Sequence, residues 1–414
     1  MGRGQAVSVG EALRLLFNLP VNKTFPERTP LEAAYGRILS SDIVAREDMP
    51  GFARSTVDGY AVKASDTFGC SETVPAYLTL RGEVRMGESA SVSLGPGDAI
   101  SIPTGGMLPR GADAVVMLEH VQTSGGDVLE ILRPVAPAEN VIRADEDVSK
   151  GERVLGLGHR LRPQDVAALA GMGITEVPVY GRPAVAIVST GDEIVPARSA
   201  IRPGQVRDVN SFNLAGLIQD AGGVAKKMGI FPDDYTAISG AVKEALDSCD
   251  MVLVTGGSSV GLKDMTARIF EDIEKGSVIF HGVAVKPGKP LIAGLVKGKP
   301  VFGLPGHPAA VTLSFLNFVR PILLKMAGYE PGPAENYFDR VTAILAKNIS
   351  SAPGREDHIR VSLFTKDGTL YAEPIFGKSG LIKTLVLADG IVVVPAEAQG
   401  IARDEMVEVR VFRR

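Results

Sequence analysis

The sequence predicts a multidomain α/β protein with a central doubly wound α/β domain, a β-rich second domain and a small all-β domain near the C-terminus. At 414 residues the chain has room for roughly two to four domains, and 45% hydrophobic residues supply several cores. Apolar runs and helical patterns alternate over residues 182–326, and short alternating segments fill the regions on either side. The 47 glycines and 27 prolines show no Gly-X-Y period, which favours turns and close backbone approaches over collagen or disorder.

Before residue 182 the patterns are mixed. Val9–Leu19 and Leu31–Leu39 carry apolar residues at helical spacing, and Gln164–Gly171 predicts a further helix. Residues 74–139 are short segments of alternating apolar and polar residues punctuated by glycine, which is typical of strands and turns. The predicted strands in this region are Ala76–Val84, Asp98–Pro103 and Ala114–Glu119.

The central region predicts a doubly wound parallel sheet because runs typical of buried strands alternate with helical patterns. The strands are expected at Ala184–Ser189, Ala225–Ile230, Met251–Thr255 and Val301–Leu304. The helices are expected at Asn213–Ala221, Tyr235–Leu246, Asp264–Ile273 and Ala309–Met326. After a linker at Gly328–Asn336, the runs that predict the all-β domain are His358–Phe364, Leu370–Pro374, Gly390–Pro395 and Met406–Phe412.

Charge and cysteine content exclude several classes of protein. The formal net charge is −4 and no Lys/Arg-rich run is present, so we expect no nucleic-acid partner. Two distant cysteines, Cys70 and Cys249, form no disulfide framework and suit a reducing cytoplasm. The most apolar run, Val311–Met326, is interrupted by Arg320 and Pro321 and is shorter than the roughly 18 residues of a membrane span, so we expect a cytoplasmic protein without a membrane partner.

Three strands of the central region end in unusual loops, at the edge where ligands bind to open α/β sheets. Their glycines permit positive φ angles, and the N–H groups at a helix start can bind an anion. Any one loop is equally consistent with an ordinary strand-to-helix turn, but three in one domain favour a site. The loops are Thr190–Glu193, Thr255–Asp264, which holds Gly256, Gly257 and Gly261, and Pro305–Pro308.

Acidic and basic residues of these loops suggest what the site binds. Glu193 and Asp264 are candidate oxygen ligands for Mg²⁺ beside a phosphate, and Asp192, Asp233 and Asp234 are further candidates. The alternative is that each acid is a solvated side chain or a helix cap, and Asp264 stands where an N-cap is expected.

The segment Val285–Pro290 presents two lysines, Lys286 and Lys289, on a backbone stiffened by prolines and a glycine. Rigid paired cations suit a phosphate or an oxyanion, and a charged hairpin tip is the alternative. In the first half, Asp58 in a Gly turn and Thr104 beside two glycines are weak signals by themselves. The residues thus predict a phosphate-bearing ligand with a divalent cation at the open end of the sheet.

In their order these loops resemble the MoeA family of molybdopterin molybdenumtransferases, which includes the E domain of gephyrin. The resemblance covers essentially the whole chain, and seven ordered motifs make it specific. The motifs are STVDGYAV (55–62), IPTGG with PRGADAVVMLEH (102–120), STGDE (189–193), TGGSSVGLKD (255–264), VKPGKP (285–290), LPGHPAA (304–310) and GREDHIRV (354–361).

This resemblance implies a fold and an activity. The fold is a homodimer of four-domain subunits with a MogA-like central domain and a C-terminal β-barrel. The active site combines the central domain of one subunit with the β-rich domain of the other. The activity is insertion of molybdate-derived molybdenum into adenylylated molybdopterin, with release of AMP and with help from Mg²⁺. The implied domains are I at 5–26 and 140–181 with part of 44–55, II at 27–139, III at 182–327 and IV at 330–414.

The resemblance also implies roles for individual residues. The proposed catalytic residues are Asp58, Thr104, Glu193, Asp233 and Asp264, of which Asp58, Glu193 and Asp264 hold the metal. The proposed substrate-binding residues are Gly256, Gly257, Ser258, Gly261, Lys286, Lys289, Pro305, Pro308, Asp147, Arg355 and Ser379. Two positions depart from the family pattern: Gly282 replaces a basic residue present in some members, and His307 replaces a common Asn.

Other activities remain open alternatives to molybdenum insertion. They are the adenylyltransferase step that makes the substrate, insertion of tungstate in place of molybdate, and a non-catalytic scaffold like the gephyrin E domain. The molybdopterin adenylyltransferase is also a candidate partner protein.

Overall fold

The computed structural model describes residues 6–256, 260–329 and 338–412. The chain folds as two compact units, each described here by itself. The main unit contains Met1–Glu27, Gly36–Ser40 and Pro178–Arg414, and the second unit contains Arg28–Tyr35 and Ser41–Val177. The finer division into four domains stays a prediction.

A six-stranded sheet with the order β16-β13-β17-β21-β20-β18 forms the centre of the main unit. Its first four strands are parallel, as the buried apolar runs predict, and are β13 (Ala184–Thr190), β16 (Val224–Phe231), β17 (Met251–Gly256) and β21 (Lys299–Leu304). The antiparallel strands β18 (Ser277–His281) and β20 (Ile292–Val296) extend the sheet beyond β21.

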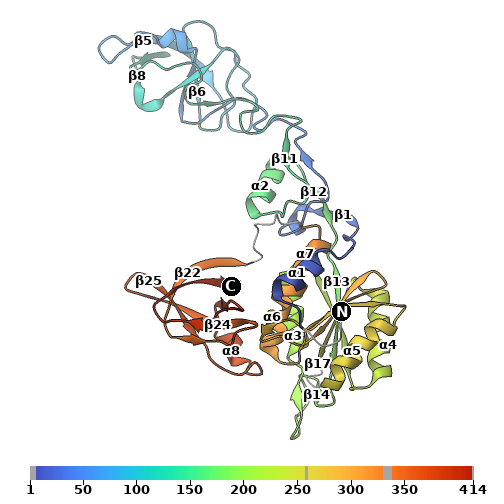
Figure 1. Cartoon of the computed structure of the whole chain (residues 1–414). Helices are drawn as coiled ribbons and strands as arrows, with labels where there is room; N and C mark the ends of the chain where they lie inside the picture. The colour runs from blue at the N-terminus through green and yellow to red at the C-terminus, as the bar shows by residue number, and fades with distance from the viewer. Residues whose placement is uncertain (1–5, 257–259, 330–337, 413–414) are drawn as a thin grey trace. The chain divides into compact units, whose positions relative to one another are not determined.

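Helices cover both faces of this sheet (Figure 1). One layer is α4 (Tyr235–Ser248) with α5 (Val260–Asp272), and the other is α1 (Val9–Phe17), α3 (Asn210–Asp220) and a helix over residues 308–326. Alternate strand residues enter different cores: Ile187 packs toward the α3 layer, whereas Ala186 and Val188 pack toward the α4 layer. The predicted doubly wound domain is therefore confirmed.

The helix over residues 308–326 consists of α6 (Pro308–Ser314), a π-helical segment (Phe315–Val319) and α7 (Arg320–Met326). Pro321 does not end this helix, because it occupies the first turn of α7, directly after the wider π-helical turn. This helix is long and apolar enough to cross a membrane, but 89% of its most apolar window is buried inside the protein. A core helix of a globular domain has the same properties.

The C-terminal strands form the expected closed barrel. Five strands pair in the order β24-β25-β22-β28-β26, and β26 pairs again with β24. The short strand β19 (Val285–Lys286) of the central region pairs with β24 and so joins the barrel to that region. The barrel strands are β22 (Asp339–Leu345), β24 (Glu356–Lys366), β25 (Thr369–Pro374), β26 (Gly390–Val394) and β28 (Met406–Val411).

The second unit is β-rich, as predicted, and contains a six-stranded sheet with the order β7-β4-β6-β5-β9-β8. These strands are β4 (Gly59–Val62), β5 (Ala76–Glu83), β6 (Asp98–Ile102), β7 (Ala114–Met117), β8 (Val121–Thr123) and β9 (Val128–Ile131). The predicted helix at 164–171 is α2 (Pro163–Gly171).

The predicted helix Leu31–Leu39 is wrong. Only a 3-10 turn, Leu31–Ala33, forms there. Gly36 has a φ of 74°, which ends a right-handed helix, and Leu39 pairs with Val179 in an isolated bridge. The apolar residues of this segment have helical spacing, but a short 3-10 turn and extended backbone place their side chains in the core.

Candidate functional site

Two adjoining cavities lie at the carboxyl ends of the central strands, where the predicted site loops meet. Strand pairing places Thr190 beside Gly256 and Thr255 beside Leu304, so these loops start side by side. Both cavities are lined by Gly306 and His307. The first cavity, about 610 Å³, is also lined by Lys286, Lys289, Pro305, Arg355 and Ser379. The second, about 540 Å³, is also lined by Thr190, Glu193, Asn210, Gly256 and Pro308.

Gly256 shows that backbone approach shapes the second cavity. It has a φ of 132°, and a Cβ at this position would lie 1.9 Å from the carbonyl oxygen of Thr190. Only glycine fits such a position, in agreement with the role that the sequence suggests. Gly257 and Ser258 lie outside the described residues, and Gly261 falls within α5.

Hydrogen bonds fix the loop that separates the two cavities. Asn210 Nδ2 donates to the carbonyl oxygen of Gly306 at 2.8 Å, and Pro308 occupies the first position of α6, as expected. On the barrel side, His307 Nδ1 and Ser379 Oγ are 2.9 Å apart, and Ala309 N–H donates to the Ser379 carbonyl. His307 therefore links the Pro305–Pro308 loop to the segment of Ser379. This contact is the consequence of having His at position 307.

The first cavity gathers the predicted cations. Lys286, the last residue of β19, and Lys289, in the turn that follows, are exposed. Arg355 directly precedes β24, the strand that pairs with β19. Three cationic side chains on one wall suit an oxyanion, because each offers N–H donors along with positive charge.

Three acids, Asp192, Glu193 and Asp233, lie close together beside the second cavity. The pKa of Asp233 is raised above its usual value by burial and, to a smaller extent, by repulsion from Asp192 and Glu193. Asp233 N–H donates to Asp192 Oδ1 at 3.1 Å, and Asp233 Oδ1 is buried without a hydrogen-bond partner among the described residues. The three carboxylates thus lie close enough to repel one another, although only Glu193 of the three lines the cavity.

The prediction of an N-cap at Asp264 is wrong. The helix α5 begins at Val260, so Asp264 lies exposed in its second turn. The sequence predicted a helix start at Asp264 because the regular apolar spacing begins there, one turn after the first residue of α5.

The acids fit a magnesium ion only in part. Within the described ranges, no three His, Cys, Asp or Glu side chains form a group that can hold a metal ion. Mg²⁺ often needs only one or two carboxylates, because substrate phosphates and water complete its shell. The unpaired buried oxygen of Asp233 near Glu193 is consistent with such an open site.

The remaining predicted residues, Asp58, Thr104 and Asp147, belong to the second unit. Asp58 Oδ1 accepts hydrogen bonds from Thr104 N–H at 2.7 Å and from Thr104 Oγ1 at 3.1 Å. The Thr104 backbone N–H, and then its hydroxyl, hold the pKa of Asp58 below its usual value. The structure therefore brings these two residues together as a fixed, ionised carboxylate. Asp147 lies apart from them on an exposed turn, where its N–H donates to Met49 O.

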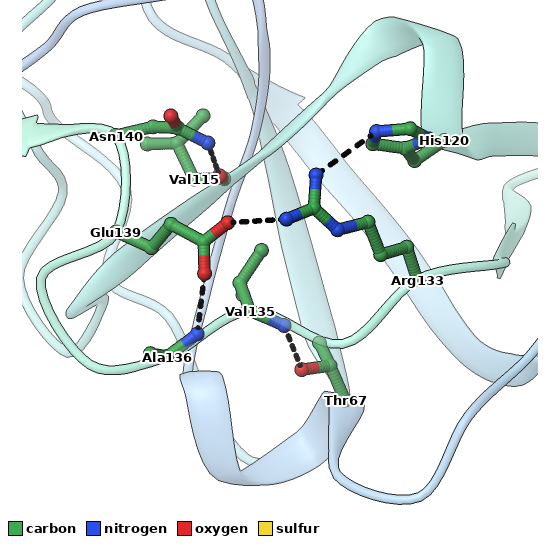
Figure 2. A network of polar contacts seen from close by, with 8 residues as sticks. All are labelled: Thr67, Val115, His120, Arg133, Val135, Ala136, Glu139 and Asn140. Carbon is green, nitrogen blue, oxygen red and sulfur yellow. Dashed lines mark hydrogen bonds and ion pairs between the residues drawn. The ribbon is translucent and has the colours of Figure 1, made fainter.

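A polar network supports the segment that carries Asp58. Figure 2 shows the Arg133 guanidinium between His120 and Glu139, with contacts of 3.3 Å to each. Because arginine only donates, His120 Nε2 is the acceptor. Asn140, next to Glu139, accepts from Thr56 N–H and donates to Val115 O, so it ties the residues just before Asp58 to β7.

Sequence reasoning missed Arg360, which is 6% exposed. Its Nη2 donates to Gly377 O, two residues before Ser379, while Nε and Nη1 have no partner in the described part of the chain. Burial lowers the pKa of this guanidinium below its ordinary value. The available signal was a charged residue at an inward position of an alternating strand, because Arg360 lies within the GREDHIRV motif.

The fold and these cavities define an α/β protein with a cation-lined cavity at the strand ends. Residues 7–173 match the MoeA N-terminal region (domain I and II), residues 186–325 a probable molybdopterin-binding domain, and residues 342–412 the MoeA C-terminal region (domain IV). The chain belongs to the MoeA family.

Full-length relatives support this membership. The putative molybdopterin biosynthesis protein of Methanocaldococcus jannaschii is 36% identical, over 95% of this chain and 94% of that protein. The molybdopterin molybdenumtransferase of Haemophilus influenzae is 31% identical over 96% of both chains.

A solved structure gives the same result for the fold. The crystal structure of the molybdopterin biosynthesis MoeA protein of Pyrococcus horikoshii OT3 is 37% identical and superposes with a TM-score of 0.84. The match covers 99% of this chain and all of that one.

Proposed function

We propose that this protein acts in molybdenum cofactor biosynthesis as a molybdopterin molybdenumtransferase. It inserts molybdate-derived molybdenum into adenylylated molybdopterin and releases AMP. One observation carries the proposal: a cavity lined by three cations adjoins, across a single loop, a second cavity that Glu193 and Asp208 line, on a chain that matches the MoeA family along nearly its whole length.

The geometry suggests how the two cavities divide the work. Lys286, Lys289 and Arg355 bind the oxyanion and offset its charge, with the Ser379 hydroxyl as a further polar contact. The glycine-shaped wall at Gly256 lets the substrate approach the strand ends closely. Two anions, an oxyanion and a phosphoanhydride, thus lie on opposite sides of His307.

Mg²⁺ belongs to the proposal as a cofactor. Glu193 and Asp264 of the main unit and Asp58 of the second unit are its proposed ligands, and Asp233 is a further catalytic carboxylate. When bound, the ion supplies Lewis-acid activation of the phosphoanhydride. The carboxylates of this chain orient it and keep the site negative until it arrives.

The assembly and location are proposed as well. We propose a cytoplasmic homodimer in which the second unit of one subunit brings Asp58 and Thr104 to the main unit of the other. Asp147 is proposed to contact the substrate from the same side. The molybdopterin adenylyltransferase, which makes the substrate, is a plausible partner for direct transfer.

A reconstituted assay tests this function. Purified protein, adenylylated molybdopterin, molybdate and Mg²⁺ are combined, and pterin-bound molybdenum and free AMP are measured. We expect both products together, and we expect Asp264→Ala to lose both while its circular dichroism spectrum is unchanged. Full activity of Asp264→Ala would overturn the proposed role of this residue, and wild-type protein that yields neither product would overturn the function.

The same assay separates the alternatives. AMP transfer from ATP to molybdopterin without molybdate would identify an adenylyltransferase. Faster insertion from tungstate than from molybdate would identify a tungsten enzyme. Protein that binds neither the adenylylated pterin nor Mg²⁺ would indicate a scaffold.

A further inference from the structure

A buried carboxylate lies behind the cationic wall of the first cavity. Asp357, on β24, is 1% exposed, and Arg355 Nε donates to its Oδ1 at 2.9 Å. Its Oδ2 lies 3.7 Å from Lys286 Nζ and has no hydrogen-bond partner among the described residues. Lys286 and Arg355 line the cavity, so one hidden anion contacts two of its three cations.

Strand register explains why these three charges meet. Lys286 of β19 and Asp357 of β24 are paired residues of a parallel ladder, so their side chains project to the same face. Arg355 precedes Asp357 by two residues and shares that face, as its hydrogen bond to Asp357 shows. The joint between the central region and the barrel therefore places the carboxylate between the two cations.

Burial makes the arrangement informative. A carboxylate at 1% exposure is costly unless cations compensate it, whereas Lys286 and Arg355 are long side chains that remain 58% and 38% exposed. Long exposed side chains sample many rotamers unless a fixed group restrains them. An incoming oxyanion then meets cations that are already oriented, at a lower entropic cost.

We propose that Asp357 is a positioning residue that holds Lys286 and Arg355 at the cavity wall for a doubly charged tetrahedral oxyanion. The inference rests on the proposed function for the choice of molybdate as that oxyanion. The charges suit a doubly charged oxyanion. The cations Lys286, Lys289 and Arg355 together with the anion Asp357 carry a net charge of +2.

Two substitutions in the full-length protein separate position from charge. Asp357→Asn removes the charge and keeps the shape, whereas Asp357→Glu keeps the charge and displaces it by one methylene. We expect both to raise the dissociation constant for molybdate about tenfold, measured by isothermal titration calorimetry, with sulfate as a second probe. If charge alone mattered, Asn would tighten binding and Glu would leave it unchanged; either result overturns the inference.

The control is Asp250→Asn, which should leave molybdate binding unchanged. Asp250 directly precedes β17 and accepts from the N–H of Ala184, at the start of β13 and away from the strand ends that form the cavities. A double-mutant cycle covers the case in which Asp357→Asn folds poorly: in a Lys286→Met background, Asp357→Glu should cost much less than tenfold. Fully additive losses would overturn the inference. Wild-type protein that binds molybdate without inserting it would end the proposed function alone, and wild-type protein that binds no oxyanion would end both.

Discussion

At the end of β17 a single backbone position leaves no room for a side chain. The φ of Gly256 is positive, and an added Cβ would overlap the carbonyl of Thr190 on the neighbouring strand. We expect Gly256→Ala to lower the free energy of unfolding by about 3 kcal/mol or more, because both strain and a steric clash result. Urea denaturation measures the loss.

Gly240, inside α4, is the matched control. A Cβ there meets nothing within 4 Å, and the position is an ordinary helical one. Gly240→Ala should therefore raise the free energy of unfolding by about 0.5–1 kcal/mol. Equal effects of the two substitutions would show that the close approach at Gly256 does not constrain the fold.

Asp165 gives the second unit a pH-dependent stability. It is 5% exposed at the start of α2, where Arg162 donates to both carboxylate oxygens and His159 Nε2 donates to Oδ2 at 2.6 Å. The Arg162 guanidinium and, to a smaller extent, His159 hold the pKa of Asp165 well below its usual range. Because the pKa is lowered on folding, the stabilisation is complete above about pH 4 and is lost as the pH falls through the folded value.

We expect Asp165→Asn to lower the stability of the second unit by about 2 kcal/mol at neutral pH, since Arg162 loses its anionic partner and His159 loses its acceptor. The difference from wild type should shrink below about pH 4. Denaturant titrations from pH 7 to pH 3 measure it, and the exposed Asp42, which accepts from Leu157 N–H, is the control with a smaller expected loss. A difference that grows toward acid would contradict the sign.

At the scale of elements, the helix over residues 308–326 reaches both cavities with its first turn, since Ala310 lines the first and Pro308 the second. Phe318, in its π-helical segment, is buried in the core with Phe315 and Val319. We expect Phe318→Ala to lower the free energy of unfolding of the main unit by about 3–5 kcal/mol, because it creates a cavity in a packed core. Phe376, an exposed phenylalanine of the barrel region, should tolerate the same change within about 1 kcal/mol. A small loss at Phe318 would mean that the π-helical turn repacks.

The elements that sequence predicted best are those whose environment is simple. Of the four parallel strands, β13, β17 and β21 are buried along nearly their whole length and β16 is the half-exposed edge strand. All four predicted apolar runs end within two residues of the observed strands. Prediction failed where tertiary contacts decide. Leu31–Leu39 has helical spacing but is held by a bridge to Val179.

The candidate site shows the same division. The loops were predictable, because strand ends of a doubly wound sheet must converge, and the structure brings Lys286, Lys289, Arg355 and Ser379 to one cavity. The supporting contacts of Asp357, Arg360 and Asn210 were not, because each joins segments that are apart in the sequence. A charge at an inward strand position marks Arg360, but local sequence does not show which group it contacts.

For the whole molecule, the decisive question is whether one site uses two chains. Asp58 and Thr104 form a hydrogen-bonded pair in the second unit, whereas Glu193 and Lys286 line cavities of the main unit. If the active site is shared between subunits, mixing Asp58→Ala with Asp264→Ala protein after subunit exchange should restore about a quarter of wild-type activity. Half of the dimers are then mixed, and each mixed dimer has one intact site of two.

Asp233→Ala mixed with Asp264→Ala is the control that should restore nothing, because both changes fall in the same unit. No activity with the first pair would show that each chain completes its own site, and activity in the control would show that Asp233 and Asp264 do not serve the same site.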